Sequence, residues 1–432
     1  MRRALSLILV SMSLALLSAN AQEAKPAGRW HRFQPRSSSK PLTFTSEEER
    51  LEIERLEAMG YLSGSQPAKA QTGILRHDRN RAYQGLNLYV SGHGPVAHLM
   101  AMDGTLLHKW GLSYFDAFPN AHPPAHVEVP NHWRRAYLYP NGDLIANYGG
   151  WGLVKLDKDS NLVWGIDARI HHDIDVTEDG DVFTLERQGV RIPELNARRA
   201  VVMDYLVQLS SEGKVKRRIS FFDCMRNSMY APMIERLRTR GDILHANTVQ
   251  VLDGEHADRL PAFKKGNVLV SMRNCDTIAV IDPDAEAFVW ALSGLWHRQH
   301  EPVLLHTGNM LIFDNLGLGN RSRILEFEPE TQEVVWEYGS GEAEFFYTRL
   351  IGSVQRLPNG NTLISESDNG RVFEVTPEKE IVWEFVSPYL AGPNDEYIAS
   401  VYELVRLEPD FPNDWADPDT LSISIGAGQG QN

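Results

Sequence analysis

From Leu86 onward, apolar and polar residues alternate in short runs that are separated by turns containing Gly with Asp or Asn. The clearest runs are AYLYPNGDLIANY, DIDVTEDGDVFTL, PVLLHTGNMLIFDN and SVQRLPNGNTLISES. Alternation of this kind around turns that tolerate a positive φ predicts β-hairpins. Each run is followed by a second hairpin pattern that ends near an aromatic residue, as in VFEVTPEKEIVWEF. The sequence therefore predicts an all-β chain.

The hairpin pairs repeat along the chain. A four-stranded unit repeated about every 40–50 residues, without helical periodicity between the copies, is typical of a β-propeller. We expect six blades within residues 81–410, which would form one propeller domain. The widest gap between copies contains FFDCMRNSMYAPMIERLRTRGD, which predicts a helical insertion between blades three and four. The residues that close the copies, which we assign to packing between blades, are Trp110, Trp164, Ile219, Trp290, Trp336 and Trp383.

The two ends of the chain differ from this pattern. MRRALSLILVSMSLALLSANAQ joins two arginines, an apolar run and a small-x-small motif, which predicts a secretory signal peptide over residues 1–21. The apolar run is too short to span a membrane comfortably, so we expect a periplasmic or secreted protein without a membrane span after its removal. Residues 22–80 predict a polar linker with a short helical arm, because Ser46 and Glu49 have capping-box spacing. Residues 411–432 predict a flexible tail.

The composition and the absence of common motifs argue against several classes of function. The chain has 43 Lys and Arg against 57 Asp and Glu, a formal net charge of −14, so no global basic surface for nucleic acid is expected. No phosphate-binding loop, dinucleotide fingerprint or nucleophile elbow occurs in the sequence, so a nucleotide-dependent mechanism has no support. The two cysteines, Cys224 and Cys275, are compatible with one disulfide or with two free thiols. The oligomeric state stays open.

Histidine recurs at the start of the first strand in three successive copies. His172 and His300 each lie 8 residues before the glycine of the following turn. His245 lies 21 residues before its turn glycine, and the extra loop GEHADRLPAF accounts for most of the difference. Arg134 stands at the same place in the second blade. The other histidines, among them His171, share no such position and are interpreted as surface or packing residues.

Polar residues also recur after the turns. Seven residues beyond the same glycines stand Arg187, Arg273 and Asn315. Positions on either side of a tight turn face each other across an antiparallel hairpin. We therefore expect three neighbouring pairs: His172 with Arg187, His245 with Arg273, and His300 with Asn315.

These side chains should meet at the mouth of a central channel, since the first strands of all blades line it. Several imidazoles with one or two guanidinium groups suit a tetrahedral oxyanion. Two alternatives stay open at this point: purely structural histidines, and zinc held by three neutral histidines, although an adjacent arginine would repel the dication. The Pro- and His-rich stretch FPNAHPPAHVEVPNHW is expected as a rim loop, and Phe346 and Tyr347 as an aromatic wall.

A resemblance to a known protein family rests on four segments of the sequence: DILHANTVQVL, GNVLVSMRNCDTIAVID, RQHEPVLLHTGNMLIFDN and YIASVYELVRL. Over about residues 85–408 the chain resembles the bacterial arylsulfate sulfotransferases. The resemblance implies a periplasmic six-bladed propeller that uses no cofactor and no nucleotide donor, and that passes a sulfuryl group from an aryl sulfate to a phenol. It further implies that His300 is the nucleophile, that His245 and His172 are the other channel histidines, and that Arg273 binds the sulfuryl group. Asn247 matches a polar partner.

Elementary chemistry agrees with this resemblance. A neutral imidazole can attack sulfur to give an N-sulfonated histidine, and Arg273 can stabilise the charge that develops on the sulfuryl oxygens. His245 or His172 can then exchange the phenol proton. The alternatives that remain are aryl sulfate hydrolysis at the same site, a ligand-binding or scaffold propeller without catalysis, and a zinc- or quinone-dependent enzyme.

Overall fold

The computed structural model describes residues 63–123, 129, 132–392 and 394–422. The expected signal peptide and the expected helix after Ser46 lie outside these residues. Residues 66–67 and 73–77, expected as linker, form the short strands β1 (Gln66–Pro67) and β2 (Gly73–His77). In the described part of the chain, no helix is long and apolar enough to cross a membrane.

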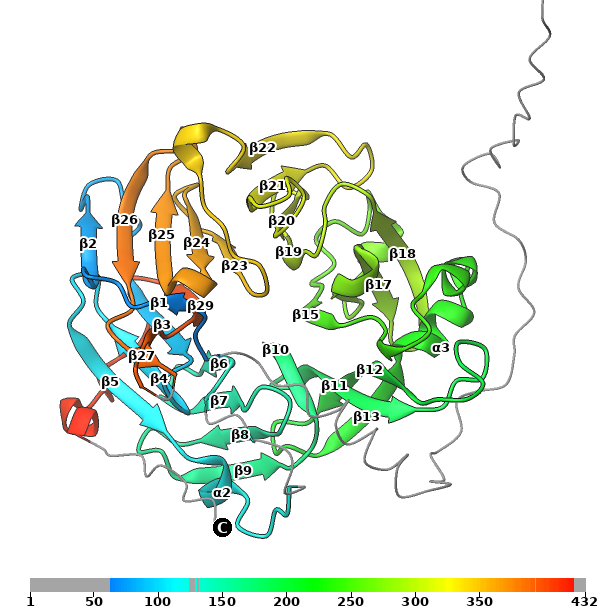
Figure 1. Ribbon diagram of the computed structural model, residues 1–432, viewed down its shortest axis with the longest axis horizontal. Helices are drawn as coiled ribbons and strands as arrows, with labels where there is room; N and C mark the ends of the chain where they lie inside the picture. Colours follow the sequence, from blue (N-terminus) through cyan, green and yellow to red (C-terminus); the bar gives the residue numbers. More distant parts are fainter. Residues whose placement is uncertain (1–62, 124–128, 130–131, 393, 423–432) are drawn as a thin grey trace, which may run out of the picture.

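The all-β prediction is confirmed. Within the described residues, six antiparallel sheets are each built mainly from four neighbouring strands, and they are arranged in a ring (Figure 1). The first contains β29 (Val401–Leu407), β3 (Leu86–Ser91), β4 (Val96–Met100) and β5 (Leu106–Gly111); the second β6 (Arg135–Leu138), β7 (Leu144–Asn147), β8 (Leu153–Leu156) and β9 (Leu162–Ile166); the third β10 (Ile170–Val176), β11 (Val182–Val190), β12 (Val201–Leu209) and β13 (Val215–Ser220). The fourth contains β15 (Ala246–Val251), β16 (Val268–Met272), β17 (Thr277–Asp282) and β18 (Ala287–Ser293); the fifth β19 (His300–Leu304), β20 (Met310–Asp314), β21 (Arg323–Phe327) and β22 (Val334–Tyr338); the sixth β23 (Ser353–Arg356), β24 (Thr362–Glu366), β25 (Arg371–Val375) and β26 (Ile381–Val386).

Shorter strands and helices lie beside the six sheets. The two-residue strand β14 (Gly241–Asp242) pairs with β12, β2 pairs with β26, and β1 joins β27 (Leu390–Ala391) and β28 (Tyr397–Ile398). Between β13 and β14 lie the helix α3 (Phe221–Arg226) and the 3-10 helix η1 (Ala231–Arg236), and α2 (Tyr114–Ala117) follows β5. The remaining 3-10 turns are η2 (Pro261–Phe263), η3 (Arg273–Cys275), η4 (Glu342–Glu344), η5 (Ser367–Asn369) and η6 (Pro418–Ser422).

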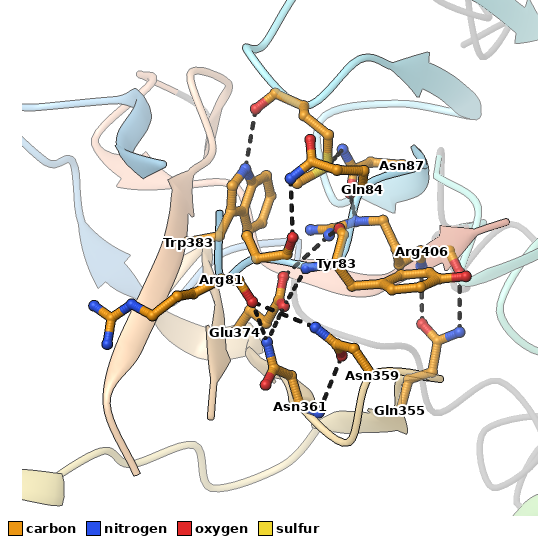
Figure 2. Close-up of polar contacts among 12 residues, drawn as sticks. Arg81, Tyr83, Gln84, Asn87, Gln355, Asn359, Asn361, Glu374, Trp383 and Arg406 are labelled. Atoms are coloured by element: carbon orange, nitrogen blue, oxygen red, sulfur yellow. Dashed lines mark hydrogen bonds and ion pairs between the residues drawn. The ribbon is translucent and has the colours of Figure 1, made fainter. Parts of the chain in front are cut away.

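The ring is closed by a strand from the C-terminal end. β29 pairs with β3, so that sheet combines the first and last parts of the described chain. Arg406 on β29 is fully buried beside Glu374 of the sixth sheet, at 3.0 Å, and its Nε donates to Asn87 Oδ1 at 2.6 Å (Figure 2). Its guanidinium also lies 4.7 Å from the centre of the Trp383 ring. These contacts connect the sixth sheet to the first.

Tryptophans at the outer strands join neighbouring sheets, as the repeat predicts. Trp110 Nε1 donates to the Gly142 carbonyl oxygen at 3.0 Å, and Trp383 Nε1 donates to that of Met102 at 3.0 Å. Both side chains are fully buried. Trp164 and Trp336 make the same kind of bond to Ser211 and Pro377. Each indole therefore packs on the next sheet while its only polar atom is satisfied.

Two other expectations concern the segments outside the sheets. Cys224, buried in α3, and Cys275 are free thiols, so the disulfide alternative is not realised. Part of the expected flexible tail is packed on the ring: Trp415 lies 5.6 Å from Trp110 between ring centres, and its Nε1 donates to the Pro140 carbonyl oxygen at 2.9 Å.

Candidate active site

Three strands near the ring centre, β10, β15 and β19, carry β-bulges close to their first residues. The pairing register shifts between His171 and Ile174 in β10, between Ala246 and Thr248 in β15, and between His300 and Val303 in β19. Within the first and third of these bulges His172 and Glu301 adopt left-handed φ angles of 58° and 49°, and His245, the residue before β15, has a φ of 55°. Such conformations cost about 1–3 kcal/mol each and cluster at functional sites, and bulges re-aim side chains there.

Because of the bulges, the alignment of the copies on their turn glycines is one residue out in the third sheet. His300 pairs with Phe313, and His171 pairs with Leu185, which are equivalent partners five residues after their turn glycines. His171, and not His172, is therefore the structural counterpart of His300. The expected pair of His172 and Arg187 is shifted accordingly: the Arg187 amide donates to the Arg169 carbonyl oxygen at 3.1 Å. Counting residues in the sequence could not detect an extra residue on one side of a hairpin.

His300 and Asn315 are neighbours, as predicted. His300 is buried, and its Nδ1 lies 2.7 Å from Asn315 Oδ1. The Asn315 amide nitrogen donates to the carbonyl oxygens of Thr348 and Ile351 at 2.9 and 2.7 Å. His300 Nε2 is buried and has no hydrogen-bond partner among the described residues. Burial and, next, the charge of Arg273 hold the pKa of His300 well below its ordinary value.

His245 and Arg273 are also neighbours, because the Arg273 amide donates to the His245 carbonyl oxygen at 3.2 Å. His245 Nδ1 lies 2.5 Å from Asp242 Oδ2, and Asp242 Oδ1 accepts the His245 backbone N–H at 3.1 Å. Burial and the nearby Arg298 lower the pKa of Arg273 to about 10, so its guanidinium remains charged at neutral pH. Asp242, on β14, was not singled out in the sequence.

The third histidine belongs to a chain of polar side chains. His172 Nδ1 lies 2.6 Å from His171 Nδ1, and His171 Nε2 lies 3.1 Å from Asp204 Oδ1. The ring of His172 also meets that of His245 edge to face, with centroids 4.9 Å apart. Burial is the first cause that holds the pKa of both His171 and His172 well below the ordinary value, and nearby arginines are the second. His171, interpreted from the sequence as a surface or packing residue, is fully part of this group.

Arg134 supplies a second positive charge to the group. Its side chain is buried, and its guanidinium carbon lies 5.5 Å from the centre of the Tyr402 ring. Its charge contributes to the lowered pKa of His171, His172 and His300. The sequence did place Arg134 at the position of the channel histidines, and that shared position was the signal for its role.

Asn247 and Arg187 are both buried, and each lies against the backbone of a neighbouring sheet. Asn247 donates its side-chain amide to the Gln299 carbonyl oxygen at 2.8 Å, which connects β15 to the residue before His300. Arg187 is buried beneath the backbone of Gly150, where an added Cβ would lie 2.7 Å from Arg187 Nη2. Gly150 has φ +100°, so this close approach depends on glycine.

The expected aromatic wall is not formed by Phe346. Its ring is buried in the core between the fifth and sixth sheets, 5.7 Å from Phe313 and 5.8 Å from Tyr338 between centroids. Core packing therefore explains why this position is aromatic. Tyr347 is half-buried, and its backbone amide donates to Glu366 Oε1 at 3.0 Å. Much of the expected rim loop, residues 124–128 and 130–131, lies outside the described residues.

Charged residues from four sheets form ion pairs near the ring centre, next to the histidines. Arg135 on β6 is ion-paired with Glu301 on β19 and Glu403 on β29, and its Nε lies 3.4 Å from Asp173 Oδ1 on β10. One arginine thus bridges carboxylates from three other sheets across the ring centre. Burial raises the pKa of Glu301 to about 8 and that of Glu403 to about 7, although Arg135 opposes the shift. A cavity of about 840 Å³ borders both carboxyls.

In the described part of the chain, the group of side chains whose ligand atoms lie close enough to hold a metal ion is Asp253, Glu255 and His306. All three are exposed. The channel histidines are not part of this group.

A family model described as arylsulfotransferase (ASST) matches residues 137–388, more than half of the chain. The chain belongs to the arylsulfotransferase family. The matched region contains all the predicted site residues, and Arg134 and Arg135 stand just before it. No curated protein matches the sequence of this arylsulfotransferase family member.

Solved structures resemble the chain only distantly. They include a protein of unknown function from Bacteroides caccae, 12% identical, with a TM-score of 0.49 over 74% of this chain and 98% of that chain. Virginiamycin B lyase from Staphylococcus aureus is 12% identical, with a TM-score of 0.37 over 61% of this chain and 72% of the lyase chain. The WD40 β-propeller domain of Doa1 is 12% identical, with a TM-score of 0.41 over 80% of this chain and 96% of that chain.

Proposed function

We propose that this member of the arylsulfotransferase family transfers a sulfuryl group from an aryl sulfate to a phenolic acceptor, with His300 Nε2 as the nucleophile. The six sheets would be the blades of a propeller whose catalytic domain spans residues 81–410. Residues 1–21 would direct the protein to the periplasm or out of the cell. The observation that carries the proposal is the hydrogen bonding of His300.

The tautomer of His300 follows from its partner. The carbonyl oxygens of Thr348 and Ile351 can only accept, so they require the NH₂ group of Asn315 to face them. Asn315 Oδ1 is then an acceptor, and His300 Nδ1 must carry the hydrogen. Because the depressed pKa keeps the ring neutral, Nε2 bears a lone pair. A neutral imidazole nitrogen without a competing hydrogen bond is a competent nucleophile toward sulfur.

The positive charges near His300 can attract the anionic aryl sulfate donor. A sulfate ester is an anion, and more negative charge collects on the leaving phenol oxygen as the S–O bond breaks. Arg273 is half-buried and Arg134 is buried, and the charge of each lowers the pKa of His300, so they can bind the sulfuryl oxygens and stabilise that charge. Arg273 Nε is buried without a hydrogen-bond partner among the described residues, which leaves a donor for this purpose.

The transfer then proceeds in two balanced halves. His300 Nε2 attacks sulfur, the N–S bond forms, the bond between sulfur and the aryl oxygen breaks with its electron pair going to oxygen, and the phenol leaves after it gains a proton. The acceptor phenol next loses its proton, its oxygen attacks the same sulfur, and the N–S pair returns to His300. His245, which Asp242 holds as in the carboxylate–imidazole pairs of acid–base enzymes, or His172 then exchanges these protons with the phenols.

The test is a transfer assay. Purified protein is mixed with 4-nitrophenyl sulfate, with and without a second phenol, and both coloured product and the new aryl sulfate are quantified. We expect the second phenol to be sulfated in amounts that match the 4-nitrophenol released, and His300→Ala to abolish both. His306→Ala, at an exposed histidine, is the matched control and should keep full activity. Release of 4-nitrophenol without a sulfated acceptor would overturn the transferase proposal.

A further inference from the structure

The reaction above needs a proton at the leaving oxygen, yet His172 and His171 are buried where an imidazolium is disfavoured. We propose that Asp204, His171 and His172 form a proton relay, in which Asp204 is the proton store and His172 Nε2 is the end that faces the reacting phenol. This inference rests on the proposed function. Asp204 and His171 act through His172 and are positioning residues, while His172 would contact the phenol.

The three groups lie in one line of short contacts. Asp204 Oδ1 is 3.1 Å from His171 Nε2, and His171 Nδ1 is 2.6 Å from His172 Nδ1. The contact between Asp204 Oδ1 and His171 Nε2 does not have hydrogen-bond geometry, so proton transfer between these atoms requires a small rotation of the His171 ring. All three side chains are at most 2% exposed. At the far end, the His172 ring touches the ring of His245 within the channel group.

A contact between two Nδ1 atoms allows two proton arrangements. In the first, Asp204 is protonated and donates to His171 Nε2, His171 Nδ1–H donates to His172 Nδ1, and His172 carries its hydrogen on Nε2. When Nε2–H protonates the leaving phenolate, the other two protons each move one place toward His172. In the second arrangement Asp204 is a carboxylate, His171 holds the hydrogen on Nε2, and His172 holds it on Nδ1.

The relay explains why neutral histidines can do acid–base work here. In both arrangements each imidazole carries one hydrogen and no charge, so the net change is the loss of the Asp204 proton to the phenol. The incoming phenol returns that proton by the reverse steps. Burial and the nearby Asp242 raise the pKa of Asp204 to about 7, which suits a group that must gain and lose a proton near neutral pH.

The surroundings of Asp204 fix its two oxygens for different tasks. Oδ2 accepts the backbone N–H of Ala246 at 3.0 Å, which leaves Oδ1 for His171. The charged or titratable groups that face Asp204 from other elements are Asp242 on β14, Arg187 on β11, His171 on β10, His245 beside β15, and Cys275 in η3. Asp242 opposes ionisation of Asp204, whereas Arg187 and His245 favour it.

The relay predicts a dependence on the leaving group. Donors that release a weakly basic phenol, such as 4-nitrophenyl sulfate, hardly need an acid, whereas phenyl sulfate does. Asp204→Asn preserves an acceptor for the Ala246 amide but cannot supply a proton, and His171→Gln interrupts the chain at its centre. In the first half-reaction, measured as a single burst of phenol release without an acceptor, we expect both variants to release 4-nitrophenol from 4-nitrophenyl sulfate within about 3-fold of the wild-type rate. With phenyl sulfate we expect a loss of roughly 100-fold or more, the usual size of a general-acid effect. The matched control is Asp314→Asn, at a buried carboxyl outside the site.

A second readout does not depend on activity. ¹⁵N spectra of histidine-labelled protein report which ring nitrogen carries hydrogen. We expect His171 and His172 to exchange tautomers together as Asp204 titrates, and to remain in one tautomer in Asp204→Asn. Equal losses with both donors would overturn the relay. An imidazolium at His171 or His172 over the pH range in which Asp204 titrates would overturn it as well. If the wild type transfers no sulfuryl group from any donor, the proposed function fails, and the tautomer measurement alone decides the relay.

Discussion

Asn315 Oδ1 accepts a hydrogen bond from His300 Nδ1 at 2.7 Å, and this contact sets which nitrogen of His300 faces the channel group. Asn315→Ala would remove the acceptor and let the ring adopt either tautomer and rotate. We expect a loss of about 10–100-fold in the transfer rate, by analogy with the removal of an outer partner from a metal-bound histidine, together with a fall of about 1–3 kcal/mol in unfolding free energy.

A buried asparagine elsewhere separates these two effects. Asn267 donates its amide to the Ala262 carbonyl oxygen at 2.8 Å, outside the site, and is 1% exposed. Asn267→Ala should lower the unfolding free energy by a similar amount and leave transfer unchanged. If both variants lose the same fraction of transfer activity at a temperature where both are folded, Asn315 has no special role toward His300.

Arg273 is the largest charge influence on His300, so its removal should change both rate and pH dependence. Arg273→Ala should lower kcat by about 10²–10³-fold, the typical cost of losing one donor to a developing oxyanion. Because Arg273 lowers the pKa of His300, the acid limb of the rate profile should move to higher pH in the variant. Arg321→Ala, at an arginine that donates to three backbone carbonyls of the loop after β22, is the control and should leave the profile in place. An unchanged acid limb in Arg273→Ala would contradict this assignment.

Glu301 should make the protein less stable as pH rises. Its folded-state pKa is raised to about 8 from an ordinary value of 4.5, so between these values the folded chain keeps a proton that the unfolded chain releases. Its contribution is therefore complete below about pH 4.5 and is lost as pH rises through about 8. Glu301→Gln should flatten this decline in urea unfolding curves measured from pH 5.5 to 8.5. Glu178→Gln, whose side chain is 96% exposed, should follow the wild type, and parallel curves for all three proteins would refute the prediction.

Arg406 and Glu374 should be coupled in stability, because both side chains are 0% exposed and they join the last sheet to the first. Arg406→Met alone leaves a buried carboxylate without its cation, and we expect a cost of about 3–5 kcal/mol in unfolding free energy. Arg406→Met combined with Glu374→Gln should cost clearly less than the sum of the single variants. Additive costs in this double-mutant cycle would show that the ion pair does not hold the ring closed.

The fold was largely predictable because its information is local. Alternation of apolar and polar residues, turn glycines and closing tryptophans such as Trp110 and Trp383 are each read within one hairpin, and the structure has the sheets where these signals occur. The prediction that Phe346 forms an aromatic wall was wrong because an aromatic residue after a strand fits both a channel rim and a core. Only the packing of neighbouring sheets distinguishes the two.

The site was less predictable because it depends on bulges and on side chains from different sheets. His300 and Asn315 face each other across one hairpin, so their pairing could be read from spacing. His171 could not, because the bulge after it changes which residue matches His300. Asp204 on β12 and Asp242 on β14 reach the histidines from strands outside the first hairpin of each copy, and the sequence alone gives no signal for such contacts.

The central claim, that the sulfuryl group rests on His300 between the two half-reactions, is tested most directly by mass spectrometry. The protein is mixed with 4-nitrophenyl sulfate in the absence of an acceptor, rapidly quenched at alkaline pH, and its intact mass and peptides are measured. We predict one added SO₃ group on the peptide that contains His300, lost when a phenol is added and absent from His300→Ala. A turning-over enzyme that carries no such group, or that carries it on another residue, would contradict the account.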